Sequence, residues 1–131
     1  MHVRDHIFAM ARLPAPKRSS GGGEKSLFRV DDHFQVAEFD GEIDFTAWED
    51  FRARLTPLAQ ADAAIVDLSK VTYMDSRALT EILFLQRSRS REGRSTLGVV
   101  LGPRVRRLFE IAGLADVLRL TNSLEEAKAL R

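Results

Sequence analysis

The chain has 131 residues, of which 44% are apolar and 30% charged, and its formal net charge is +1. This length allows one domain with a single hydrophobic core. The near-neutral charge provides no general attraction to nucleic acid or to a membrane surface, so we expect neither as a partner. The sequence has no cysteine, which excludes disulfides and thiolate metal sites.

The first 25 residues differ in composition from the rest of the chain. They carry five Lys or Arg against two Asp or Glu, and residues 12–25 include two prolines, two serines and three consecutive glycines. Such a stretch buries too little apolar surface to offset its ordering entropy. We therefore predict a flexible basic leader over 1–25 and a domain over 26–131. Because no apolar run is long enough for a secretory signal or a membrane span, we expect a cytoplasmic protein.

The domain is predicted to begin with a hairpin. Residues 27–30 and 34–39 have the composition of two short strands, with a turn at 31–32 and an end at 41–44. Thr46 and Glu49 then have the spacing of a capping box, in which each side chain satisfies a free amide of the other residue. We expect a helix that carries its apolar residues at helical spacing, namely Trp48, Phe51, Leu55 and Leu58.

Pro57 lies inside this helical pattern and predicts a kink or an early end. The continuous apolar run 63–68 is typical of a strand covered on both faces, and residues 96–101 form a second such run. Between them, a helix is predicted from its apolar residues Ala78, Leu79, Ile82, Leu83 and Leu85. Gly93 is placed to end that helix.

Four arginines lie near the end of this second helix, where they suit the negative end of the helix dipole. They are Arg87, Arg89, Arg91 and Arg94. We interpret them as a solvated helix end in preference to a docking surface.

The remaining chain repeats the alternation of strand and helix. Pro103 opens a helix that Gly113 closes, residues 117–120 form a short strand, and Ser123 with Glu126 makes a capping box for a terminal helix. Alternation of this kind predicts an α/β domain with right-handed crossovers. The sheet should be largely parallel, with one antiparallel strand from the opening hairpin.

Five segments resemble the STAS domain family in their order and spacing. They are Gly41-Glu42-Ile43-Asp44, residues 65–71, Tyr73-Met74-Asp75-Ser76, residues 105–109 with 112–114, and residues 123–127. The resemblance covers roughly residues 27–130. It implies a STAS-type fold with a mixed, mostly parallel sheet of four to five strands and about four helices, in the order β-β-α-β-α-β-α-β-α.

Within this family the chain resembles the bacterial anti-sigma factor antagonists. The resemblance implies that Ser76, directly after Asp75, is a phosphorylation site. The implied partner is an anti-sigma factor serine kinase with a histidine-kinase-like ATPase fold, which the unmodified antagonist sequesters and the phosphorylated form releases. The resemblance also implies a metal-dependent serine phosphatase that resets the cycle. The antagonist itself is expected to have no catalytic residue, cofactor or metal.

The residues around Ser76 are assigned by the same resemblance. Asp44 and Asp75 are expected to flank the hydroxyl, and Arg77, Ala78 and Leu79 to form the adjoining partner-binding segment. A phosphate at a helix start adds a charge of about −1.5 to −2, which the helix dipole accommodates, so the switch should act at the interface without refolding. A second interpretation stays open, because Asp75 and Ser76 also suit a simple helix cap.

The chain departs from the family pattern directly after Ser76. Many antagonists have a small hydroxyl residue and then glycine at the positions of Arg77 and Ala78. Ala78 favours the helix. Arg77 can pair with a phosphate or oppose the usual partner surface, and we hypothesise that it tunes partner choice.

Other functions are less well supported by the sequence. The three histidines, His2, His6 and His33, belong to no catalytic constellation, and no G-x-S-x-G elbow is present. Asp67 is interpreted as a structural carboxylate near a strand end. A phosphate-accepting role for it, as in receiver domains, is disfavoured because no lysine follows the late strand 96–101. The alternative that remains is a constitutive STAS interaction module, acting as an accessory subunit of a lipid ABC transporter or as a scaffold in a stress complex.

Overall fold

The structure is a computed structural model that describes residues 28–31 and 33–129. The predicted leader, residues 1–25, lies outside the described residues, as does Leu27 at the predicted start of the first strand. The boundary between leader and domain therefore stays a prediction.

A mixed sheet forms the centre of the described fold. Its strands are β1 (Phe28–Asp31), β2 (Phe34–Ile43), β3 (Ala64–Met74), β4 (Gly98–Leu101) and β5 (Arg119–Thr121). They lie in the order β1-β2-β3-β4-β5, with β1 antiparallel to β2 and every later pair parallel. The predicted α/β class and the mostly parallel sheet are confirmed.

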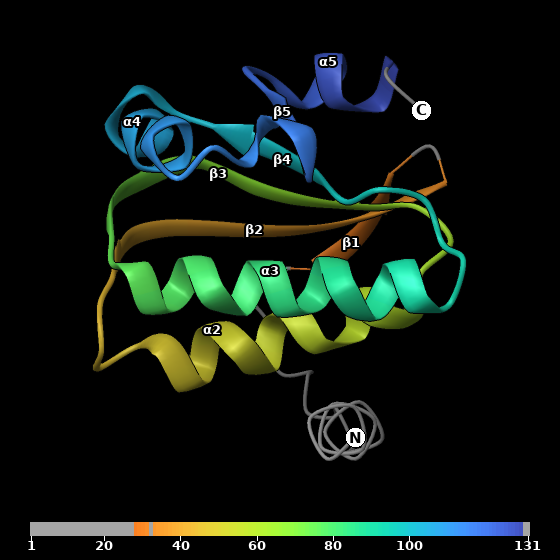
Figure 1. The fold of residues 1–131 in the computed structure, drawn as a ribbon, viewed down its shortest axis with the longest axis horizontal. Coiled ribbons are helices and arrows are strands. Elements are labelled where there is room, and N and C mark those ends of the chain that lie inside the picture. The colour runs from red at the N-terminus through yellow and green to blue at the C-terminus, as the bar shows by residue number, and fades with distance from the viewer. Residues whose placement is uncertain (1–27, 32, 130–131) are drawn as a thin grey trace.

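Helices follow each parallel strand. They are α2 (Trp48–Leu55), the 3-10 helix η2 (Thr56–Gln60), α3 (Ser76–Arg91), α4 (Pro103–Ile111), the 3-10 helix η3 (Leu114–Asp116) and α5 (Leu124–Ala129). Figure 1 shows α2 and α3 side by side on one face of the sheet, with α5 on the opposite side. The long parallel connections place the start of each helix at the edge where the preceding strand ends.

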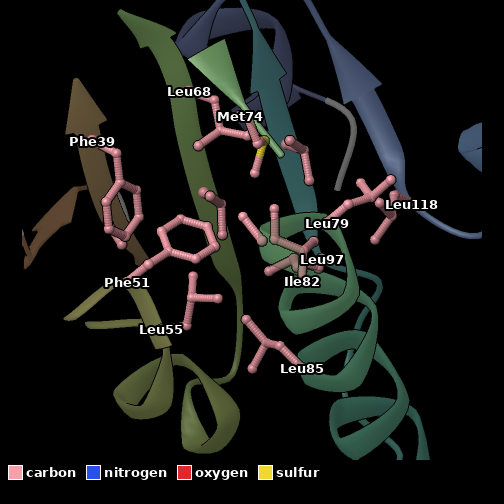
Figure 2. Close-up of a cluster of buried hydrophobic side chains, with 14 of the residues drawn as sticks. Phe39, Phe51, Leu55, Leu68, Met74, Leu79, Ile82, Leu85, Leu97 and Leu118 are labelled. Atoms are coloured by element: carbon pink, nitrogen blue, oxygen red, sulfur yellow. The ribbon is translucent and has the colours of Figure 1, made fainter. Parts of the chain in front are cut away.

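The main core lies between the sheet and the helices that follow β2, β3 and β4. Side chains from α2, α3 and α4 share one buried cluster with the inward residues of the sheet. Figure 2 shows Phe39 of β2 facing Phe51 of α2, and their ring centroids are 4.7 Å apart. A smaller cluster on the other face joins Ala127 of α5 to Val36 and Ile65.

The two central strands run further than the sequence predicted. Gly41 was predicted to begin the end of the hairpin, but β2 continues through it to Ile43. Gly41 has φ of 73°, a left-handed value that glycine adopts without strain, and the pairing register shifts on both sides of it. Pairing of β2 with β3 therefore extends to Ile43 and Met74.

The first predicted capping box does not form, and the second forms only in part, because Glu126 Oε1 accepts from the amide of Asn122 and not from that of Ser123. The N-cap of α2 is Ala47, without a side-chain hydrogen bond, because the Thr46 hydroxyl donates to Asp44. At α5, the Ser123 hydroxyl oxygen accepts from the Glu126 amide at 3.1 Å, as predicted. The predicted early end near Pro57 is also confirmed, since α2 gives way to η2 at Thr56.

The prediction of a wholly solvated arginine cluster at the end of α3 is wrong for Arg89. This side chain is 0% exposed, and its Nη1 donates to the carbonyl oxygens of Leu58 and Ala61, each at 2.7 Å. Its Nε and Nη2 donate to Ser95. Burial lowers the pKa of Arg89 to about 10, so the guanidinium stays charged at neutral pH. Arg89 thus ties the end of η2 to the loop before β4.

Candidate functional site

The predicted site residues meet at the edge where β2 and β3 end. Ile43 pairs with Met74, and the Asp75 amide donates to the Ile43 carbonyl oxygen at 3.2 Å. Asp44 and Asp75 therefore leave two neighbouring strands at the same level. In Figure 1 this edge is where β3 turns into α3 and where the chain from β2 turns towards α2.

Asp75 and Ser76 have different roles at the start of α3. Asp75 is the N-cap, with extended backbone, and its Oδ1 accepts from the Ala78 amide at 3.1 Å. Ser76 is the first residue of the helix, and its side chain is exposed. The capping interpretation therefore holds for Asp75, while the Ser76 hydroxyl lies on the surface at the positive end of the helix dipole.

Asp44 is engaged within its own turn. Its Oδ1 accepts from the Thr46 hydroxyl at 2.6 Å and from the Thr46 amide at 3.0 Å. These hydrogen bonds, the hydroxyl first, hold the pKa of Asp44 below its ordinary value of 3.8. The turn next to the start of α3 consequently carries a negative charge throughout the physiological pH range.

Arg77 points towards α2 and takes part in a four-residue group that the sequence did not reveal. Its guanidinium carbon lies 3.9 Å from the ring centroid of Trp48, and its Nε lies 3.8 Å from Oε2 of Glu81. Arg52 approaches the same two partners, at 4.7 Å from the Trp48 ring and 3.3 Å from Oε1 of Glu81. We call Trp48, Arg52, Arg77 and Glu81 the α2–α3 charge cluster.

The sequence gives a partial indication of this cluster. Arg52 follows Trp48 by four residues and Glu81 follows Arg77 by four, which is the spacing of neighbours on a helix surface. Trp48 was predicted as part of the apolar face of α2, and the structure leaves it only half-buried. The residue pair on α2 and the residue pair on α3 meet only because the two helices pack against each other. Local spacing does not reveal that packing.

Two predicted partner-binding residues are core residues. Ala78 and Leu79 are buried in the main cluster and contribute little side-chain surface to a partner. Their burial follows from helical periodicity, because the inward face of α3 begins at its third residue. The exposed apolar surface at this edge comes from Phe45 and Tyr73.

Asp67 is structural, as interpreted from the sequence, but its predicted place near a strand end is wrong because β3 continues to Met74. It is buried in the middle of β3, and its Oδ1 accepts from the Ser69 amide at 2.9 Å. Among the described residues, no three His, Asp or Glu side chains gather in a way that could hold a metal ion. Within the same part of the chain, no helix is long and apolar enough to cross a membrane.

A cavity of about 510 Å³ lies at the opposite edge of the sheet, where the parallel strands begin. Its polar lining includes Asp62 and Ser95. Asp62 pairs with Arg94 at 3.3 Å, and Ser95 accepts from the buried Arg89, so both polar groups support the fold. The cavity is separate from the edge that carries Ser76.

Comparison with known proteins places these residues in a family context. The family model described as STAS domain matches residues 27–127. The chain is 34% identical over 86 residues to the anti-sigma-B factor antagonist of Bacillus subtilis, covering 65% of this chain and 79% of that protein. It is 28% identical over 96 residues to the anti-sigma-B factor antagonist of Staphylococcus aureus strain NCTC 8325, covering 72% of this chain and 89% of the relative.

Solved structures share the fold. A putative anti-sigma factor antagonist from Thermotoga maritima superimposes with a TM-score of 0.69 at 18% identity, covering 78% of this chain and 90% of that one. An anti-sigma factor antagonist from Mycobacterium paratuberculosis gives a TM-score of 0.69 at 23% identity, covering 81% and 92%. The predicted fold class is confirmed by these neighbours.

Proposed function

This chain belongs to the STAS domain family, and on that premise we propose that it is an anti-sigma factor antagonist switched by phosphorylation of Ser76. In the unmodified form it binds and sequesters an anti-sigma factor serine kinase with a histidine-kinase-like ATPase fold, which frees a sigma factor. In the phosphorylated form it releases that kinase. The names of the relatives support the antagonist role, and the residues around Ser76 support the switch.

The exposed position of Ser76 beside the N-cap residue is the main support for the proposal. Ser76 is the exposed first residue of α3, while the N-cap of the helix is supplied by Asp75. Modification of the hydroxyl therefore leaves the cap intact, and the new charge faces unpaired amides at the start of a helix. The domain should remain folded, so that the effect of modification falls on the partner.

The proposed group transfer is simple in chemical terms. The Ser76 oxygen attacks the γ-phosphorus of ATP held by the partner, the bond to the β-phosphate oxygen breaks, and ADP leaves. The hydroxyl proton passes to a base on the kinase. The product carries about −1.5 to −2 additional charge at neutral pH, next to a turn in which Asp44 is already ionised. On a docked surface this charge meets repulsion and desolvation, which weakens the complex.

The experiment that tests the proposal is affinity purification of the tagged protein from its host, with identification of its partners by mass spectrometry. We expect a kinase-fold anti-sigma factor with the wild type and with Ser76→Ala, and its loss with Ser76→Asp. A metal-dependent serine phosphatase acting on the modified protein would complete the cycle.

The constitutive interaction module gives a different result. A transporter ATPase or a scaffold protein that is recovered equally with wild type, Ser76→Ala and Ser76→Asp would overturn the switch. The family assignment would be unaffected, since it does not depend on Ser76.

A further inference from the structure

The α2–α3 charge cluster holds Arg77 by replaceable contacts. The Arg77 side chain is 52% exposed, and its ion pair with Glu81 is 3.8 Å long. Its contact with the Trp48 face is a cation–π interaction at the surface, which is a weak interaction in water. Little interaction free energy is therefore lost when the Arg77 side chain leaves this position.

Glu81 keeps a partner when Arg77 moves. This carboxylate is 6% exposed, and a buried carboxylate without a counter-charge would be costly. Arg52 lies closer to it than Arg77 does, with its Nε 3.3 Å from Oε1, and also covers Trp48. Because Arg52 stays paired with Glu81, Arg77 is not needed to hold this carboxylate in place.

A phosphate on Ser76 would compete for the same guanidinium. Arg77 is the next residue in the chain, and its long flexible side chain extends from the same first turn of α3. A guanidinium and a phosphate form charge-assisted, often bidentate hydrogen bonds that are stronger than an exposed pair with a carboxylate. The charge of the phosphate also exceeds that of Glu81.

We propose that Arg77 is a phosphate-responsive side chain. In the unmodified chain it rests on Trp48 and Glu81, and it moves to the phosphate once Ser76 is modified. The inference rests on the proposed function in that Ser76 is the acceptor. Its consequence is that modification also uncovers one face of Trp48, so the surface change extends from the start of α3 to α2.

The test uses the full chain with phosphoserine placed at position 76 by genetic encoding or semisynthesis, so that no cellular kinase is required. Phosphorus NMR then follows the second pKa of the phosphate, which is about 6 in the absence of a partner. We expect this pKa to be lower by about half a pH unit in the phosphorylated wild type than in phosphorylated Arg77→Gln. Arg87→Gln is the matched control, because it removes an exposed guanidinium from the far end of the same helix, outside the α2–α3 charge cluster, and should leave the phosphate pKa unchanged.

Trp48 provides a second readout, because it is the only tryptophan in the chain. Phosphorylation should shift its fluorescence to longer wavelength and raise its quenching by acrylamide, while unmodified Arg77→Gln should already show this behaviour. Equal phosphate pKa values in wild type and Arg77→Gln would overturn the inference, as would a Trp48 signal insensitive to the phosphate. Failure of the proposed function would instead be seen as the absence of a kinase partner in the purification.

Discussion

Arg77 in the first turn of helix α3 and Arg89 in its last turn differ in almost every physical respect. Arg77 in the first turn is half exposed and contacts the side chains of Trp48 and Glu81. Arg89 in the last turn is completely buried, and its main partners are backbone carbonyl oxygens. The partners of Arg77 are replaceable, whereas the loss of Arg89 would remove a 2.7 Å hydrogen bond from each of two carbonyl oxygens, those of Leu58 and Ala61. One end of the helix is therefore free to respond to modification, and the other end holds the fold together.

The largest effect is expected from Arg89→Met, which keeps the aliphatic volume and removes all donors. The carbonyl oxygens of Leu58 and Ala61 would each lose the 2.7 Å hydrogen bond from the guanidinium, and Leu58 would keep only the longer one from the Ala61 amide. A buried acceptor left unpaired costs about 1–3 kcal/mol. We expect the free energy of unfolding to fall by about 3 kcal/mol, measured by urea denaturation. Arg87→Met is the matched control on the exposed face of the same turn, with an effect within about 0.5 kcal/mol. Similar stabilities for the two variants would break the distinction between the ends of α3.

At the other end of the helix, the cap should matter more than the proposed acceptor. Asp75→Ala removes the side chain that accepts from the Ala78 amide and should lower the free energy of unfolding by about 1 kcal/mol. Ser76→Ala should change it by less than about 0.5 kcal/mol, because Ser76 is exposed. Thermal and urea unfolding of both variants measure the difference. A larger loss for Ser76→Ala would mean that the hydroxyl has a structural role.

Arg52 and Arg77 both contact Glu81 but should differ in their effect on stability. Arg52→Gln should cost more stability than Arg77→Gln, because Arg52 lies closer to the buried carboxylate. For Arg77→Gln we expect a loss of no more than about 1 kcal/mol, and this loss should shrink in high salt. Urea denaturation at low and high ionic strength checks both statements. An effect of Arg77→Gln equal to that of Arg89→Met would contradict its proposed mobility.

The smallest expected effect on stability comes from the turn beside Ser76, which contains Asp44. The pKa of Asp44 is lowered by Thr46, so stability from these hydrogen bonds is present above 3.8 and is lost as the pH falls through the still lower folded pKa. Carboxyl NMR titration should place Asp44 below 3.8 in the wild type, and Thr46→Val should raise its pKa towards that value. A wild-type pKa at or above 3.8 would show that the turn is open in solution.

Much of the fold could be predicted from the sequence because hydrophobic periodicity and the helix-ending effects of proline and glycine are local. Pro57, Gly93 and Gly113 end helices at or near the predicted places, and Ser123 caps α5 as expected. The position of Ser76 at the start of a helix was equally accessible, since a helical pattern begins just after it, although the preceding strand was expected to end at residue 68.

What the sequence could not predict depends on packing between distant segments. Arg89 resembles its neighbouring arginines locally, and it is buried only because η2 presents carbonyl oxygens to it across the interior. Thr46 has the spacing of a cap but bonds to Asp44, an alternative that spacing alone cannot rank. The α2–α3 charge cluster likewise depends on the contact between two helices, so Glu81 was missed.

The proposed switch is tested by measuring the affinity of the purified chain, with and without phosphoserine at position 76, for the proposed kinase-fold anti-sigma factor. We expect binding to the unmodified chain and to Ser76→Ala, and an affinity at least tenfold lower for the phosphorylated form, which corresponds to about 1.4 kcal/mol. Circular dichroism of both forms should remain the same, because the change is confined to the surface. Equal affinity for the modified and unmodified chains would contradict the proposed switch at Ser76.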